Sequence, residues 1–277
     1  MQTYPTTRKR ITALISATKI LSSTCQLFII DKRSKKPHGC AVLVTYNSKY
    51  YCLSNSHVFN KSKFPNVYML TRNNEYVLLE GGLIYSEPNL GNNINNDTFD
   101  VGIMELTGQV KDKFLGYTFL ELDQIETSVT LLRNNVTMIA AYPATKTKFD
   151  SKTKSLKFNP LIVRTIPITK DYSNIGFPKT YHHVVDYPKN SFKETSTEQR
   201  MTAAQPHGMS GSGLWILAGK SELDYQPFLI GILSEYHENK SIIFSTKIDL
   251  YLSIIKQLFD NSLPYNGINV DLTVKLR

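Results

Sequence analysis

The chain has 277 residues, of which 41% are hydrophobic, 20% charged and 11% aromatic, a composition that excludes intrinsic disorder as the main state. No apolar run reaches the roughly 18 residues that a membrane-spanning helix requires. The formal net charge of +9 comes from lysines in short groups. No zinc-finger, RNP or helix-turn-helix signature accompanies this charge, so we expect no specific nucleic-acid binding and no membrane binding.

The first predicted element is an amphipathic helix near residues 8–20. Its apolar positions Ile11, Leu14, Ile15 and Ile20 fit one buried face. The same stretch starts basic and turns apolar, which also resembles a weak signal peptide. Lys19 interrupts the apolar run and no clean cleavage site follows, so the helix is the favoured interpretation.

Short runs rich in valine, isoleucine, tyrosine and threonine then recur every ten or so residues, from "TCQLFII" to "SIIFST". Polar and glycine clusters separate them, which is typical of an all-β sandwich or barrel. About thirteen such strands are too many for one small barrel, so we expect two β-units with a boundary near residues 118–130. "KIDLYLSIIKQLF" predicts a second helix near 247–260, because Ile248, Leu252, Ile255 and Leu258 form one stripe.

The three cysteines, Cys25, Cys40 and Cys52, are odd in number and show no CxxC spacing. This pattern predicts reduced, buried thiols in a reducing compartment. His38 and His57 lack the spacing of metal ligands, so no metal site is expected.

The stretch "PHGMSGSGLW", residues 206–215, is unusually rich in glycine. Glycine at 208 would let the amides of Gly208 and Ser210 point at one spot, where they could stabilise an oxyanion. Glycine at 211 would keep the far side of Ser210 open to substrate. A tight β-turn between strands explains the same residues, so the stretch alone leaves nucleophile and turn equally open.

A nucleophilic serine needs a base, and a third group must orient that base. His57 is the best candidate base, because "YYCLSNSHVF" indicates a buried strand that runs into a small polar turn. In "NNDTFDVGIMEL", Asp100 stands directly before an apolar strand, with Asp97 as the second candidate. Taken singly, each residue is more often structural than catalytic.

Taken together, the order His57, Asp100, Ser210 is that of the chymotrypsin-type triad. The chain resembles the trypsin-like (chymotrypsin-fold) serine peptidases, especially bacterial and intracellular-type members. The resemblance rests on "CLSNSHVF", "FDVGIMEL" and "PHGMSGSGL", is extended by "VTMIAAYPAT", "FLIGILSEY" and "STKIDLYLSIIKQL", and covers about residues 20–260.

This resemblance implies two six-stranded antiparallel β-barrels with an N-terminal and a C-terminal helix. The expected parts are a helical extension (1–21), a first barrel with His57 and Asp100 (22–120), a second barrel with the closing helix and Ser210 (121–261), and a tail (262–277). Ser210 would be the nucleophile, and no cofactor is implied.

The resemblance also implies roles for other residues of the expected cleft. The amides of Gly208 and Ser210, with help from Met209, would form the oxyanion hole. Ser234 matches the serine whose hydroxyl contacts the buried aspartate. The residues expected to bind substrate are Ala204, Gln205, His207, Ser234, Glu235 and Tyr236.

Two departures from the family bear on regulation and specificity. Met209 replaces the aspartate that a newly cut N-terminus neutralises in digestive members, so the site must be shaped in another way. Ala204 at the pocket floor and Tyr236 on its wall predict a small or medium uncharged P1 residue, although Glu235 could attract a basic one.

The functional prediction is a cytoplasmic serine endopeptidase that acts on protein or peptide substrates. A regulatory or sensor partner would restrain it, as in bacterial antiviral defence or stress systems. The alternative is a catalytically lapsed protein-binding module of the same fold, because a fold alone does not establish activity.

Overall fold

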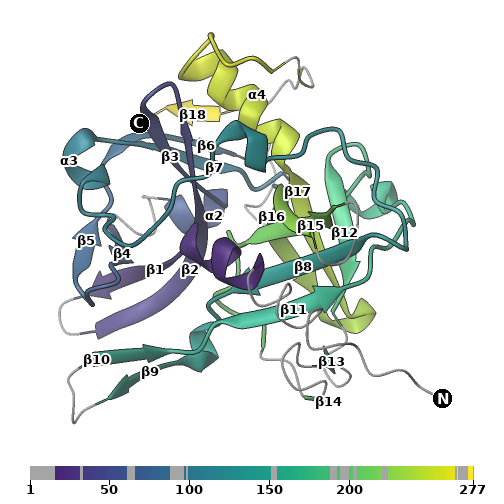
Figure 1. Ribbon diagram of the computed structural model, residues 1–277, viewed down its shortest axis with the longest axis horizontal. Coiled ribbons are helices and arrows are strands. Elements are labelled where there is room, and N and C mark those ends of the chain that lie inside the picture. Colours follow the sequence, from purple (N-terminus) through teal and green to yellow (C-terminus); the bar gives the residue numbers. More distant parts are fainter. Residues whose placement is uncertain are drawn as a thin grey trace.

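The computed structural model shows two curled antiparallel β-sheets, which lie on the left and the right of Figure 1. The residues it describes are 16–31, 34–60, 66–87, 97, 99–150, 155–187, 192–193, 200–201, 205–219, 224–265, 267 and 274–276.

The first sheet has eight strands in the order β18-β6-β7-β3-β2-β1-β4-β5. Within it, Asn47 and Ser48 connect β2 to β3 with φ angles of 50° and 61°. Two successive left-handed residues are what a type I′ hairpin turn requires. The strands are β1 (Thr24–Asp31), β2 (Ser34–Tyr46), β3 (Lys49–Ser54), β4 (Val67–Leu70), β5 (Tyr76–Leu78), β6 (Gly81–Ser86), β7 (Gly102–Leu106) and β18 (Val274–Leu276).

The second sheet has six strands in the order β11-β8-β15-β16-β17-β12. They are β8 (Val136–Ala141), β11 (Leu161–Thr165), β12 (His182–Asp186), β15 (Gly213–Ala218), β16 (Gln226–His237) and β17 (Ile242–Lys247). Two short hairpins stand outside both sheets: β9 (Thr147–Asp150) with β10 (Ser155–Phe158), and β13 (Phe192–Lys193) with β14 (Arg200–Met201).

Helices are few and short in the described part of the chain. Residues 16–22 are helical, and the named α-helices are α2 (Ser56–Phe59), α3 (Gly108–Lys111) and α4 (Ile248–Leu258). None of these described helices combines the length and the apolar composition needed to cross a bilayer. Short 3₁₀ turns are η2 (Leu122–Gln124), η3 (Ala144–Lys146), η4 (Ser173–Ile175) and η5 (Glu238–Lys240).

One buried cluster joins the two sheets and α4. It includes Val42 and Leu53 from the first sheet, Trp215 and Leu229 from the second, and Tyr251 from α4. The Tyr251 hydroxyl donates to the carbonyl oxygen of Ser54 at 2.8 Å, so a polar bond crosses the same interface. This shared core fixes the ends of the strands that carry the candidate site.

The structure confirms the all-β, two-barrel prediction but changes several details. The first sheet has eight strands rather than six, and one of them, β18, comes from the expected tail and pairs with β6. Most of the predicted N-terminal helix lies outside the described residues. The closing helix α4 is confirmed, although Leu258 is 40% exposed because the helix ends there, beyond its packed face. The domain boundaries remain a prediction.

Candidate active site

His57 lies on α2, a single helical turn that directly follows β3. Its neighbours on α2 are buried, whereas the imidazole side chain is 44% exposed. The Ser56 amide and the Asn55 side-chain amide both donate to the carbonyl oxygen of Asp100, at 3.2 and 3.1 Å. A turn fixed in this way presents an accessible imidazole in a defined position.

Asp100 immediately precedes the strand region of β7 and holds an unusual backbone conformation with φ of 48°. Aspartate tolerates this left-handed region better than most residues do, and the Asp97 carboxylate supports it by accepting the Asp100 amide at 3.1 Å. One carboxylate oxygen of Asp100 accepts the His57 amide at 3.1 Å, and the other lies 2.7 Å from His57 Nδ1. The carboxylate thus orients the ring and favours the tautomer with the proton on Nδ1.

The glycine-rich stretch forms a tight turn ahead of Ser210. The Met209 amide donates to the Pro206 carbonyl at 2.9 Å, and Gly208, with φ of 81°, occupies the position of the turn that favours glycine. The carbonyl of His207 turns outward and accepts the Ala144 amide at 2.9 Å. Since the peptide is trans, the Gly208 N–H points to the opposite side.

Two backbone amides of this turn are available. Within the described residues, neither the Gly208 N–H nor the Ser210 N–H has a hydrogen-bond partner. Free donors two residues apart, beside a serine, are what an oxyanion requires. The Met209 amide is already bonded within the turn, so the expectation that it helps the oxyanion hole is wrong.

Ser210 is fastened to the first sheet through its own backbone. Its carbonyl oxygen accepts the Cys40 amide at 2.7 Å. A Cβ added at Gly39 would lie 3.1 Å from the Ser210 carbonyl oxygen and 2.9 Å from a methyl group of Val58. Because Gly39 has no side chain, the Ser210 backbone and Val58, the residue that follows His57, can both pack closely against it. The segments that carry Ser210 and His57 therefore meet at Gly39.

Gly211 serves a different purpose from the one predicted. A Cβ at this position, where φ is 86°, would lie 2.0 Å from the Cys40 carbonyl oxygen and 2.3 Å from Ser54 Oγ. The expectation that Gly211 leaves room for substrate is wrong. It leaves room for the backbone of β2, because the two sheets meet here.

Met209 anchors the turn from below. Its side chain is 1% exposed within the core of the second sheet, and the Tyr187 hydroxyl donates to its sulfur at 3.7 Å. Tyr187 in turn contacts the Tyr236 ring edge to face, with centroids 5.6 Å apart. Apolar packing around the Met209 side chain thus holds the turn in place. No local sequence signal marks Tyr187, because its role depends on residues 22 and 49 positions away.

The end of β16 offers an open edge beside Ser210. β16 pairs with β15 only as far as Ile232, after which Leu233 bonds to Ser212 and Gly211. The segment 234–236 remains paired with β17 on one side, and no described strand pairs with it on the other. An extended peptide can pair with such an edge.

The Ser234 hydroxyl is not directed as the resemblance implied. It donates to the carbonyl oxygen of Phe244 at 3.2 Å, not to Asp100. The register between β16 and β17 shifts between Leu233 and Glu235, so Ser234 stands at a bulge that turns its side chain toward β17. The predicted serine–aspartate contact is therefore wrong, whereas the expected substrate-pairing role of this strand segment stays a prediction.

The remaining predicted substrate residues are only partly brought together. Gln205 and His207 are exposed near the turn, and Ala204 lies outside the described residues. The Glu235 carboxylate lies 2.8 Å from His237 Nε2, which neutralises part of its charge when that histidine is protonated. Tyr236 is half-buried against Tyr187.

A second histidine stands close to His57. The pKa of His38 is lowered to about 4, mainly by burial and in addition by the positive charges that His57 and His207 can carry. His38 is therefore neutral at neutral pH and adds no charge beside the candidate base. Nothing in the position of His38 in the sequence places it near His57.

Two solved structures show which fold this arrangement belongs to. A serine endoprotease from Yersinia pestis superposes with a TM-score of 0.54 at 14% identity, covering 94% of this chain and 69% of that one. A scabies mite inactivated protease paralogue superposes with a TM-score of 0.54 at 12% identity, covering 88% and 97%. The chain has the chymotrypsin fold.

At these identities the likeness shows the fold alone, and the second chymotrypsin-fold structure is that of an inactivated protein. No protein-family model and no curated protein matches the sequence. The fold therefore does not by itself establish catalysis, which depends on the residues of this chain.

Proposed function

We propose that the chain is a serine endopeptidase. His57 accepts the proton of the Ser210 hydroxyl as Ser210 attacks the scissile carbonyl, and the Gly208 and Ser210 amides stabilise the resulting oxyanion. His57 then protonates the leaving amine. In the second half of the reaction His57 takes a proton from water, the water attacks the acyl-enzyme, and His57 returns the proton to the Ser210 oxygen as it leaves. Asp100 holds the imidazole and stabilises its charged form.

One observation carries this proposal: the Asp100 carboxylate bonds to both the backbone and the ring of His57, at 3.1 and 2.7 Å. A carboxylate that served only to stabilise the turn would need the contact to the His57 amide alone, so the second contact to the ring supports a role in orienting the imidazole. The unused amides of the Ser210 turn support the same assignment, because a lapsed site would be free to lose them.

A fluorophosphonate probe tests the proposal directly, because it reacts only with an activated serine. We expect labelling of the wild type, none of Ser210→Ala, and labelling at least about 10³-fold slower for His57→Ala. Ser212→Ala is the matched control, since it removes a second serine from the same glycine-rich stretch. Labelling that survives in Ser210→Ala, or a wild type that never reacts, would refute the assignment.

We propose that the P1 residue is small or medium and uncharged. Tyr236, braced by Tyr187, narrows the wall of the expected pocket. In a peptide library the wild type should therefore disfavour aromatic P1 residues, and Tyr236→Gly should raise kcat/KM for P1 phenylalanine by about tenfold or more. A marked wild-type preference for arginine or lysine would contradict this prediction.

We propose a cytoplasmic setting, supported by Cys25, Cys40 and Cys52, which are all buried and free.

An endopeptidase in such a compartment has to be restrained, so we also propose control by a partner protein or a narrow substrate range, as in bacterial defence or stress systems. The purified chain should degrade casein slowly when no partner is added, as followed by gel electrophoresis. Rapid unaided degradation would contradict this restraint.

A further inference from the structure

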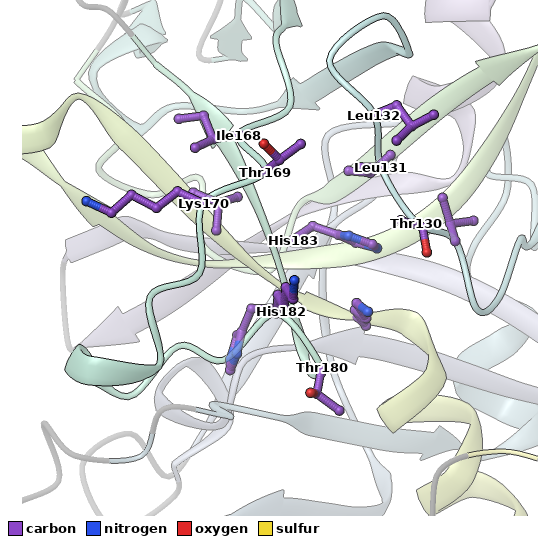
Figure 2. A pocket seen from close by; sticks show the side chains of 13 residues that line it. Thr130, Leu131, Leu132, Ile168, Thr169, Lys170, Thr180, His182 and His183 are labelled. Carbon is purple, nitrogen blue, oxygen red and sulfur yellow. The ribbon is translucent and has the colours of Figure 1, made fainter.

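A cavity of about 480 Å³ opens on the second sheet (Figure 2). Its walls are the chain at 129–132 ahead of β8, the loop at 168–170, the segment 179–184 that leads into β12, and Lys247 at the end of β17. None of the residues proposed for catalysis lines it. Its volume lies in the range of sites that hold small organic ligands.

The polar part of this cavity is strongly basic. Lys170, Lys179 and Lys247 are among its 13 lining residues, and none of the 13 is an aspartate or glutamate. The hydroxyls of Thr130 and Thr180 add neutral hydrogen-bond donors. Lys170 extends away from the centre in Figure 2, with its ammonium 5.5 Å from the centre of the Tyr172 ring. The remaining lysines of the lining, Lys179 and Lys247, are therefore the candidates for contact with a ligand.

Lys247 shows that the positive charge is poorly compensated. Its side chain is half-buried, and it forms no ion pair with any described acidic residue. Asp249 interacts with Lys247 electrostatically, but one of its carboxylate oxygens accepts the Ser128 amide and the Tyr265 hydroxyl at 2.9 and 2.8 Å. Burial lowers the pKa of Lys247, and Asp249 offsets this only in part.

The helix that begins after Lys247 also contributes to the potential near the cavity, although Asp249 in its first turn partly offsets that contribution. Lys247 is the N-cap of α4, an 11-residue helix, and no side chain caps that end. The partial positive charge of a helix N-terminus adds to that of the ammonium. A half-buried charge that Asp249 compensates only in part is unfavourable, and a bound anion would lower that cost.

The other part of the cavity is mainly apolar, with Thr169 beside Ile168 as a polar exception. Figure 2 shows Ile168, Leu131 and Leu132 on the side of the cavity opposite Thr180 and His182. Leu132 is 55% exposed, which is unusual for a large apolar side chain. A ligand with an apolar body would cover these residues while its charged group reached the lysines.

We propose that this cavity binds a small organic anion, in which a phosphate or carboxylate group is joined to an apolar body. The anionic group contacts Lys179 and Lys247, and the apolar body lies on Leu131 and Leu132. Asp171, which accepts the Lys179 backbone amide at 3.1 Å, is not part of the cavity lining. The site goes beyond the proposed peptidase function and does not depend on it.

Isothermal titration of the full chain with phenyl phosphate, inorganic phosphate and phenol tests the proposal. Phenyl phosphate should bind with saturable, one-to-one heat and at least about tenfold more tightly than inorganic phosphate or phenol. Lys247→Met should weaken that binding about tenfold, because it removes a charge-assisted contact. The Ser210→Ala variant should bind like the wild type, which separates this result from any failure of the peptidase assignment.

Lys113→Met is the matched control, since Lys113 is an exposed lysine in the turn that follows α3 and does not line the cavity. If both variants weaken binding equally, the overall positive charge explains the effect and the proposal is wrong. The absence of saturable binding to the wild type would also overturn it. Lys179→Met provides a second test of the cavity should Lys247→Met fail to fold.

Discussion

Replacing Asp100 by asparagine should lower kcat for peptide hydrolysis about 10⁴-fold while the protein stays folded. The new amide nitrogen would face His57 Nδ1, which would force the ring proton onto Nε2, the position that must accept the Ser210 proton. The change is nearly isosteric. The asparagine keeps an oxygen that can accept the His57 amide, as Asp100 Oδ1 does at 3.1 Å in the wild type. Steady-state kinetics on a peptide taken from library screening, with thermal melting as the test of folding, measures the effect.

Asp97→Asn is the control for this experiment. Asp97 was the second candidate in the sequence, but its carboxylate bonds to Ser86 Oγ and to the Asp100 amide, not to His57. An asparagine can keep both bonds, because Ser86 Oγ can accept as well as donate. We therefore expect Asp97→Asn to change kcat by about tenfold or less. Equal losses in the two variants would show that Asp100 acts only through the turn.

The second large effect is expected at Gly208. Its φ of 81° strains any other residue, and an added Cβ would lie 2.9 Å from both the backbone nitrogen and the Cβ of Ala144. Gly208→Ala should push the turn away from Ala144 and move the 208 amide off its position. We expect kcat to fall about 10²- to 10³-fold, as for other lost oxyanion donors, with little change in KM.

Gly108→Ala serves as the matched glycine control, because nothing lies within 4 Å of its added Cβ and its position starts the short helix α3. That variant should keep wild-type kinetics. If Gly208→Ala also retained wild-type kcat, the amide at 208 would have no part in stabilising the oxyanion, and a different donor would have to be sought.

The elements that local rules describe were predictable from the sequence. Alternation of apolar residues indicated the strands, and one apolar stripe indicated α4. His57, Asp100 and Ser210 could be selected because each stands at the end or start of an apolar strand, in a recognisable order. The strand and helix signals lie within about ten residues of the features they predict, whereas the three catalytic candidates were selected from their joint order and the family resemblance.

Other features depended on contacts between distant segments and could not be read in the same way. Gly211 looked like a substrate-facing glycine, yet its space is taken by the backbone of β2. Ser234 looked like a partner of Asp100, yet a bulge turns its hydroxyl to Phe244. The β18 strand, Tyr187 beneath Met209 and His38 beside His57 likewise arise only when the chain is folded.

The sequence by itself determined the all-β class, the two β-units and the three candidate catalytic residues, because backbone periodicity and turn chemistry are local properties. The tertiary structure decided which hydrogen bonds Asp100 makes, which amides of the Ser210 turn stay free, and where three lysines line a cavity that no acidic residue lines. These features depend on how segments that are about 40 to 170 residues apart in the sequence pack against one another. The residues within one short segment do not reveal which distant segment will pack against it.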